Sequence, residues 1–189
     1  MTDIVQRNVS VSMIRDNLED IPGDAWPMGV SLRWYQPGDE WHWLRIHELA
    51  DQYNTVTHDL YVREFGLDAA VLSQRQAYLV VGQDELVGTA TAWWNEDYHG
   101  QPYGRLHWVA IVPEMQGRKL ARPLLSAVCR RMKALGDKRA YLVTSTGRVA
   151  AINLYVRFGF VPEIRCQDDL AVWRQMQPYV KGRLLLEHR

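Results

Sequence analysis

The chain has 189 residues, and 47% of them are hydrophobic, which is enough to close one sizeable core but thin for two. Its 22 Lys and Arg residues balance its 22 Asp and Glu residues, so the formal net charge is zero. A neutral chain offers no broad field that would attract nucleic acid or an anionic membrane, and we expect neither as a partner. Any bound anion must therefore be held locally.

The ends of the chain and its cysteines favour a cytoplasmic protein. No apolar run approaches the roughly 20 residues that a bilayer span requires, and residues 1–12 mix polar with apolar side chains, unlike a signal peptide. The two cysteines, Cys129 and Cys166, show no spacing typical of a disulfide framework or a zinc site. His42, His47 and His58 also lack the spacing of a helical metal pair, so we expect no metal and assign them to surface or packing positions.

Hydrophobic periodicity predicts an alternation of strands and helices. In chain order the predicted elements are strands at 9–14 and 28–35, helices at 41–49 and 58–65, strands at 77–81, 86–94 and 106–112, a helix at 118–135, a strand at 141–144, a helix at 149–158 and a strand at 170–174. Asp39 is a candidate N-cap of the first helix. The order indicates a mixed α/β sheet with crossovers in its second half, where ligands usually bind at the carboxyl ends of strands.

The turn after the strand at 106–112 has the features of an anion site. A helix N-terminus offers unpaired N–H groups and the positive end of the peptide dipole. Gly117 permits close approach to the backbone, and Arg118 and Lys119 add positive charge. Taken alone, these residues are equally consistent with an ordinary strand-to-helix connection that carries a solvated basic pair.

Spacing favours the ligand-binding interpretation. Residues 116–121, Gln-Gly-Arg-Lys-Leu-Ala, resemble the coenzyme-binding motif of the GCN5-related N-acetyltransferase (GNAT) superfamily, which reads Gln or Arg, two residues, Gly, one residue, then Gly or Ala. Gln116 and Ala121 match, whereas Lys119 replaces the central glycine. We expect helical backbone geometry at Lys119, so that its Cβ does not obstruct the turn, and contact between its ammonium and a phosphate.

A second segment resembles the same superfamily. Residues 151–160, Ala-Ile-Asn-Leu-Tyr-Val-Arg-Phe-Gly-Phe, are similar to its downstream motif, in which a helix that bears Asn and Tyr ends in Gly-Phe. The resemblance implies a mostly antiparallel mixed sheet with a splayed central strand pair and flanking helices. It divides the chain into an N-terminal extension with an extra strand at 1–27, an acetyltransferase domain at 28–177 and a tail at 178–189.

The resemblance also implies an activity and a set of site residues. The activity is transfer of an acetyl group from acetyl-CoA to a primary amine of a small molecule, peptide or protein, by direct attack in a ternary complex. Tyr155 matches the tyrosine that commonly protonates the leaving sulfur, although a packed core tyrosine is the default from composition. Asn153 matches a position that often binds the coenzyme arm, with local capping an equal alternative. The implied coenzyme-binding residues are Val109, Ile111, Gln116, Gly117, Arg118, Lys119, Leu120, Ala121 and Asn153.

His107 is the candidate general base. Strand alternation places it on the same face as Val109 and Ile111, and its ordinary pKa near about 6.5 suits proton abstraction. The strand also looks like its counterpart in the arylalkylamine acetyltransferase branch, where a histidine helps to deprotonate the amine. A packed histidine is the ordinary alternative, and Glu114 and bulk water compete for the role.

The tryptophans and two rival functions are the remaining alternatives. Trp41, Trp43, Trp93, Trp94 and Trp108 could line an aromatic acceptor pocket, although core packing is the commoner use of tryptophan, and a Trp-rich surface would favour a homodimer. A non-catalytic acyl-CoA sensor, favoured by Lys119 in place of glycine, and an acyltransferase for longer chains are the rival functions. The acceptor itself cannot be read from the chain.

Overall fold

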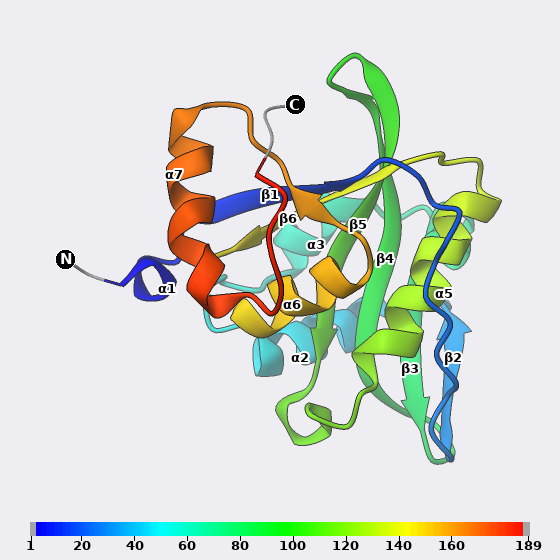
Figure 1. Cartoon of the computed structure of the whole chain (residues 1–189). Helices are drawn as coiled ribbons and strands as arrows, with labels where there is room; N and C mark the ends of the chain where they lie inside the picture. Colours follow the sequence, from blue (N-terminus) through cyan, green and yellow to red (C-terminus); the bar gives the residue numbers. More distant parts are fainter. Residues whose placement is uncertain (1–2, 187–189) are drawn as a thin grey trace.

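One seven-stranded sheet, in the order β2-β3-β4-β5-β6-β1-β7, organises the protein (Figure 1). The computed structural model describes residues 3–186. The strands are β1 Ser10–Arg15, β2 Val30–Trp34, β3 Gln76–Val81, β4 Glu85–Tyr98, β5 Gln101–Ile111, β6 Ala140–Ser145 and β7 Val161–Pro162. Within the described residues every neighbouring pair is antiparallel except β5 and β6, so the predicted mixed, mostly antiparallel sheet is confirmed.

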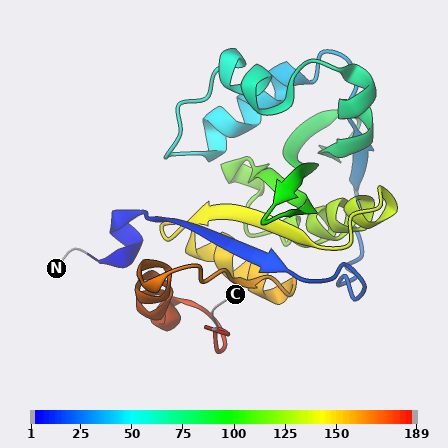
Figure 2. The same ribbon diagram turned by 90° about the horizontal axis from the view of Figure 1, so that it is seen from above.

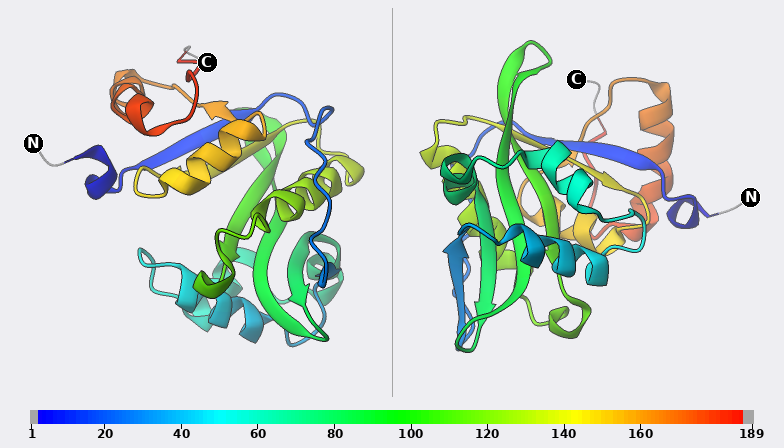
Figure 3. Two further views of the ribbon diagram at one scale, coloured as in Figure 1. Left: turned by 60° about the horizontal axis from the view of Figure 1, so that its bottom comes forward. Right: turned by 180° about the vertical axis from the view of Figure 1, so that it is seen from behind.

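Helices cover both faces of this sheet. They are α1 Ile4–Arg7, α2 Glu40–Ala50, α3 His58–Phe65, α4 Ala69–Arg75, α5 Ala121–Ala134, α6 Val149–Arg157 and α7 Gln167–Met176, with short 3-10 turns at Pro113–Met115 and Gln177–Tyr179. Viewed from above, α2 and α3 lie on one side and α5 and α6 on the other (Figure 2). The two views of Figure 3 show each helical layer in front of the strands in turn.

One local prediction was wrong, and a second was confirmed only in position. Residues 170–174 belong to α7 and not to a strand, because Leu170, Trp173 and Met176 are buried at a spacing of three, which forms one stripe along a helix. Asp39 occupies the predicted N-cap position of α2, but its side chain makes no capping hydrogen bond. Its carboxylate instead accepts a hydrogen bond from the Gln36 N–H and binds the Arg33 guanidinium.

The N-terminal strand is an integral part of the sheet. β1 pairs with β6 along its whole length and with β7 on its other side, and five of its six residues are buried. Arg15 at its end donates to the backbone carbonyls of Asn17 and Asp20. Residues 10–15 therefore form part of the same core as the rest of the domain and are not an appendage to it.

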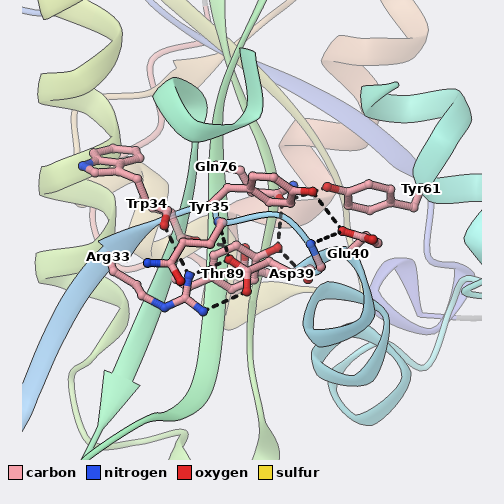
Figure 4. A network of polar contacts seen from close by, with 12 residues as sticks. Arg33, Trp34, Tyr35, Asp39, Glu40, Tyr61, Gln76 and Thr89 are labelled. Carbon is pink, nitrogen blue, oxygen red and sulfur yellow. Dashed lines mark hydrogen bonds and ion pairs between the residues drawn. The ribbon is translucent and has the colours of Figure 1, made fainter. Parts of the chain in front are cut away.

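A polar network fixes α2 and α3 on the sheet (Figure 4). Gln76 of β3 accepts hydrogen bonds at its side-chain oxygen from Tyr61 at 3.1 Å and from Tyr78 at 2.6 Å. Tyr35 donates to Glu40 at the start of α2 at 2.9 Å. Because buried polar groups are costly unless paired, this network specifies one position for the two helices.

The central strands β5 and β6 separate soon after they meet. Their pairing is limited to Gly104 with Ala140 and Arg105 with Tyr141, although both strands continue beyond these pairs. On the other side of β5, Thr89 pairs with Ala110 and Thr91 with His107, so two β5 residues oppose one β4 residue. Such a bulge bends the strand that carries it. The predicted splayed pair is thus present.

Candidate functional site

A cleft of about 910 Å³ occupies the gap between β5 and β6. Its walls come from both faces of the sheet: α2 and α3 contribute on one side, and α6 and the turn before α5 on the other. The lining includes predicted site residues His107, Val109, Ile111, Gln116, Gly117, Leu120, Ala121 and Tyr155. A molecule in this gap can therefore touch groups from both helical layers.

The turn at 116–121 has the donors that an anion needs. Within residues 3–186, the five consecutive backbone N–H groups from 117 to 121 have no hydrogen-bond acceptor. Arg118 and Lys119 are exposed beside them, and the first turn of α5 has no acidic residue. Unpaired N–H groups at the start of a helix attract negative charge, so the turn fits a phosphate group.

Gln116 has an indirect role in this turn. Its side-chain amide donates to the Ile111 carbonyl at 2.8 Å and ties the turn to the end of β5. Gly117, with φ of +74°, provides a left-handed backbone conformation that suits glycine. The motif glutamine therefore shapes the anion site through the backbone.

The expected helical geometry of Lys119 is wrong. Lys119 has φ of +63°, in the left-handed region, and α5 begins only at Ala121, three residues later than predicted. The turn thus keeps the conformation that glycine would adopt at this position, at a cost of about 1–2 kcal/mol for a residue with a Cβ. Lys119 and Arg118 are both exposed, and neither belongs to the residues that line the cleft.

On the opposite side of the sheet, Glu64 connects β5 to α3. Its Oε2 accepts hydrogen bonds from His107 Nε2 at 2.8 Å and from Trp108 Nε1 at 3.1 Å. An ionised carboxylate can only accept, so the proton of a neutral His107 lies on Nε2 and the ring's lone pair on Nδ1. Sequence reasoning missed Glu64, because it lies 43 residues from His107 on a separate helix and matches no motif.

The bulge also changes the face on which His107 lies. Its ring contacts Phe65 of α3, and the neighbouring ring of Trp108, whose φ is +46°, packs on Trp43 and His47 of α2. Two consecutive residues thus face the same helical layer. The simple alternation that placed His107 with Val109 and Ile111 is interrupted, although the cleft borders all three.

Burial sets the charge states of the groups on this side of the sheet. It lowers the pKa of His107 to about 4, although the hydrogen bond to Glu64 raises that pKa in part. It lowers the pKa of His47 to about 3. The hydrogen bond from His107 is the main reason that the pKa of Glu64 falls to about 2. Both histidines are therefore neutral at pH 7 and Glu64 is ionised, which departs from the ordinary histidine pKa assumed from sequence.

Tyr155 of α6 borders the cleft from the other side. It is 7% exposed, and its ring packs near Phe160 at 6.3 Å. Burial raises the pKa of its hydroxyl to about 12, so the phenol stays protonated near neutrality. Tyr155 therefore offers a proton or a hydrogen bond to a group within the cleft.

Asn153 lies apart from these residues. Its amide donates to the Val149 carbonyl at 2.9 Å and to the Tyr179 carbonyl at 3.1 Å, and its oxygen accepts from the Lys181 N–H at 2.6 Å. It is absent from the cleft lining. In this structure Asn153 anchors residues 179–181 to α6.

The remaining candidates divide between core and surface. Trp43 is fully buried, and Trp41 is exposed and stacks on His58. Of the five tryptophans named above, only Trp108 belongs to the cleft lining. Glu114 is exposed on the 3-10 turn.

Within the described residues there is no group of three or more His, Cys, Asp and Glu side chains able to hold a metal ion. No helix in the same range is long and apolar enough to cross a membrane.

Comparison with known families gives a match over most of this architecture. Residues 39–160 match the model of the Acetyltransferase (GNAT) family. Mycothiol acetyltransferase of Streptomyces coelicolor is 27% identical over 152 residues, which cover 75% of this chain and 46% of the relative. That of Pseudarthrobacter chlorophenolicus is 31% identical over 155 residues, which cover 75% and 45%. The chain spans about half the length of these relatives.

Solved structures share the fold. A GCN5-related N-acetyltransferase from Sphaerobacter thermophilus superimposes with a TM-score of 0.67 at 22% identity, covering 82% of this chain and 48% of that one. An aminoglycoside 6'-N-acetyltransferase from Acinetobacter baumannii gives 0.58 at 15% identity, covering 73% and 95%. At these identities the likeness concerns the fold.

Buried neutral histidines should make the protein sensitive to acid. The unfolded chain binds protons as the pH falls through 6.5, whereas folded His47 and His107 bind them only near 3 and 4, so stability should decline below about pH 6.5. Each unit of pKa difference contributes about 1.4 kcal/mol. Urea unfolding measured from neutral pH down to about pH 5 should show this slope, which His47→Gln should reduce.

A matched substitution gives the control for this slope. His42→Gln, at an exposed position of the same helix, should leave the slope unchanged. Ring resonances of His47 and His107 that titrate near their ordinary value would contradict the assignment.

The backbone of the turn generates a second prediction. Lys119→Gly should raise the free energy of unfolding by about 1 kcal/mol, because it removes the Cβ from a left-handed position. Gly117→Ala should lower it by a similar amount, although nothing lies within 4 Å of the added Cβ. Urea unfolding of both variants beside Lys119→Ala measures the effect. Equal stabilities for Lys119→Gly and Lys119→Ala would show that the backbone is not strained there.

Proposed function

The chain belongs to the Acetyltransferase (GNAT) family, and from this we propose that it transfers an acetyl group from acetyl-CoA to a primary amine of a small molecule. The observation that carries the proposal is the continuous cleft through the sheet. One end meets the unpaired N–H groups of the turn at 116–121, and the other meets Glu64 and His107. Two reactants can enter from opposite faces and meet between β5 and β6.

The comparisons support a small-molecule acceptor. The matched sequence relatives are named for mycothiol, and a structural neighbour is named for an aminoglycoside antibiotic. A peptide acceptor would also fit an open cleft. One structural neighbour is named for a ribosomal-protein acceptor, and we place the small molecule first because the matched sequence relatives are named for one.

The coenzyme side of the cleft fits the pyrophosphate and the arm of acetyl-CoA. The N–H groups from 117 to 121 would bind phosphate oxygens, with Arg118 and Lys119 neutralising charge at the rim. Backbone groups of Val109 and Ile111 would pair with the arm where β6 has moved away from β5. Acetyl-CoA, when bound, supplies an activated acetyl group.

Direct transfer requires a proton donor and a proton acceptor on opposite sides of the acetyl group. Tyr155, protonated at neutral pH, would donate toward the sulfur as it leaves. On the other face, His107 and Glu64 would hold the attacking amine, with the Nδ1 lone pair of His107 or water accepting its proton. A histidine with a pKa near 4 is a weak base, so positioning is its larger contribution.

The direct test is thiol release from acetyl-CoA in the presence of a panel of primary amines, with coenzyme binding measured by calorimetry. We expect saturable coenzyme binding and amine-dependent release. Absence of binding would overturn the proposal, and tight binding without turnover across the panel would identify a non-catalytic acyl-CoA sensor. Longer acyl donors in the same assay would reveal a different chain preference.

Tyr155→Phe tests the proton donor. The variant keeps the ring that packs near Phe160 and removes only the hydroxyl, so kcat should fall by about 10²-fold while coenzyme affinity changes little. Steady-state kinetics and calorimetry on the same preparation separate the two effects. An unchanged kcat would remove the role of Tyr155.

A further inference from the structure

Arg105 of β5 is a charged residue of the cleft lining that has neither an ion-pair partner nor a hydrogen-bond partner among residues 3–186. It borders the cleft and is half-buried, yet among residues 3–186 it forms no ion pair within 4.0 Å and no hydrogen bond. Its Nε is fully buried and unsatisfied. The guanidinium lies 5.7 Å from the Tyr141 ring centre, a contact that leaves its in-plane N–H groups free.

The other charged residues of the cleft show why this arginine stands out. Arg148 donates to both oxygens of Asp51 at 2.8 Å, so this pair is already satisfied. Glu64 uses only Oε2 for His107 and Trp108, and within the described residues its Oε1 accepts no hydrogen bond. The cleft therefore contains one cation and one carboxylate oxygen that both lack a partner in the part of the chain described.

Arg105 is far from the coenzyme's phosphates. It lies six residues before Ile111, the strand end that leads to the anion-binding turn, so their Cα atoms are at most about 20 Å apart, with the bulge in β5 between them. It lies two residues before His107, at the point where β5 and β6 part. Its charge also contributes to lowering the pKa values of both Glu64 and His107, so the three groups share one region.

We propose that the acceptor is a small aminocarboxylate, whose amine donates to Oε1 of Glu64 and whose carboxylate binds the guanidinium of Arg105. A carboxylate is the group whose two oxygens match the fork of arginine donors. Arg105 would then determine specificity, because it orients the amine of the acceptor beside His107. The proposal rests on the acetyltransferase function above and adds the chemical class of its substrate.

The experiment compares each acid with its own amide. Glycine, β-alanine and γ-aminobutyrate are assayed beside their primary amides by thiol release, and the ratio of kcat/KM for acid over amide is recorded. A charge-assisted hydrogen bond should make this ratio roughly 10 to 100 for the best acceptor in the native protein. Arg105→Gln should bring the ratio close to one, and Arg105→Lys should restore part of it, because lysine keeps the charge but not the fork.

Arg174→Gln, an exposed arginine on α7, is the matched control and should leave the ratio unchanged. A ratio near one in the native protein, or the same ratio in Arg105→Gln, would overturn the proposal. These outcomes are distinct from failure of the acetyltransferase function. If the amides are acetylated as efficiently as the acids, the acetyltransferase function stands and only the carboxylate proposal fails. If no amine causes thiol release, both the function and the proposal fail.

Discussion

The parting of β5 from β6 is the constraint on which the other features of the site depend. Strands in a sheet normally satisfy each other's backbone groups, and leaving them apart costs free energy unless another group replaces the partner. Here the separation follows from the bulge at Trp108 and Val109, which bends β5 immediately after its short pairing with β6. The unpaired length of strand leaves backbone groups facing the cleft, and the cleft extends between the two helical layers.

Packing against α2 and α3 holds the bulge of β5 in one position. Trp108 at the bulge packs at 5.1 Å against the fully buried Trp43, and its indole N–H bonds to Glu64. The helices that supply these partners are in turn fixed by the network around Gln76. A strained backbone at Trp108 thus persists because several neighbours determine its position, which is typical of functional sites.

Sequence patterns correctly predicted the features that depend on interactions between residues close in the chain. The amphipathic repeat predicted α5, and the glycine after it predicted its end; the two motifs predicted the turn at 116–121 and the placement of Tyr155 beside the cleft. The errors arose where tertiary contacts decide. Residues 170–174 are too short a window to distinguish a helix from a strand, and the conformation of Lys119 depends on how Gln116 ties the turn to β5. Glu64 could not be found, because only folding brings α3 beside β5.

Burial is the reason that the pKa of His107 differs from the value expected from sequence. An ordinary pKa assumes a solvated ring, but α3 and the ring of Phe65 exclude water from His107. Burial also makes the charges that remain in the cleft more effective, since a low local dielectric strengthens their interactions. The net charge of the chain is zero, but the two ends of the cleft differ: unpaired N–H groups with a basic rim lie at one end, and single groups of opposite sign lie at the other. On the proposed function, this difference would distinguish the two reactants. The coenzyme and the acceptor would then be held by different electrostatics within one cavity, which keeps each at its own end and leaves the gap between the strands as their meeting point.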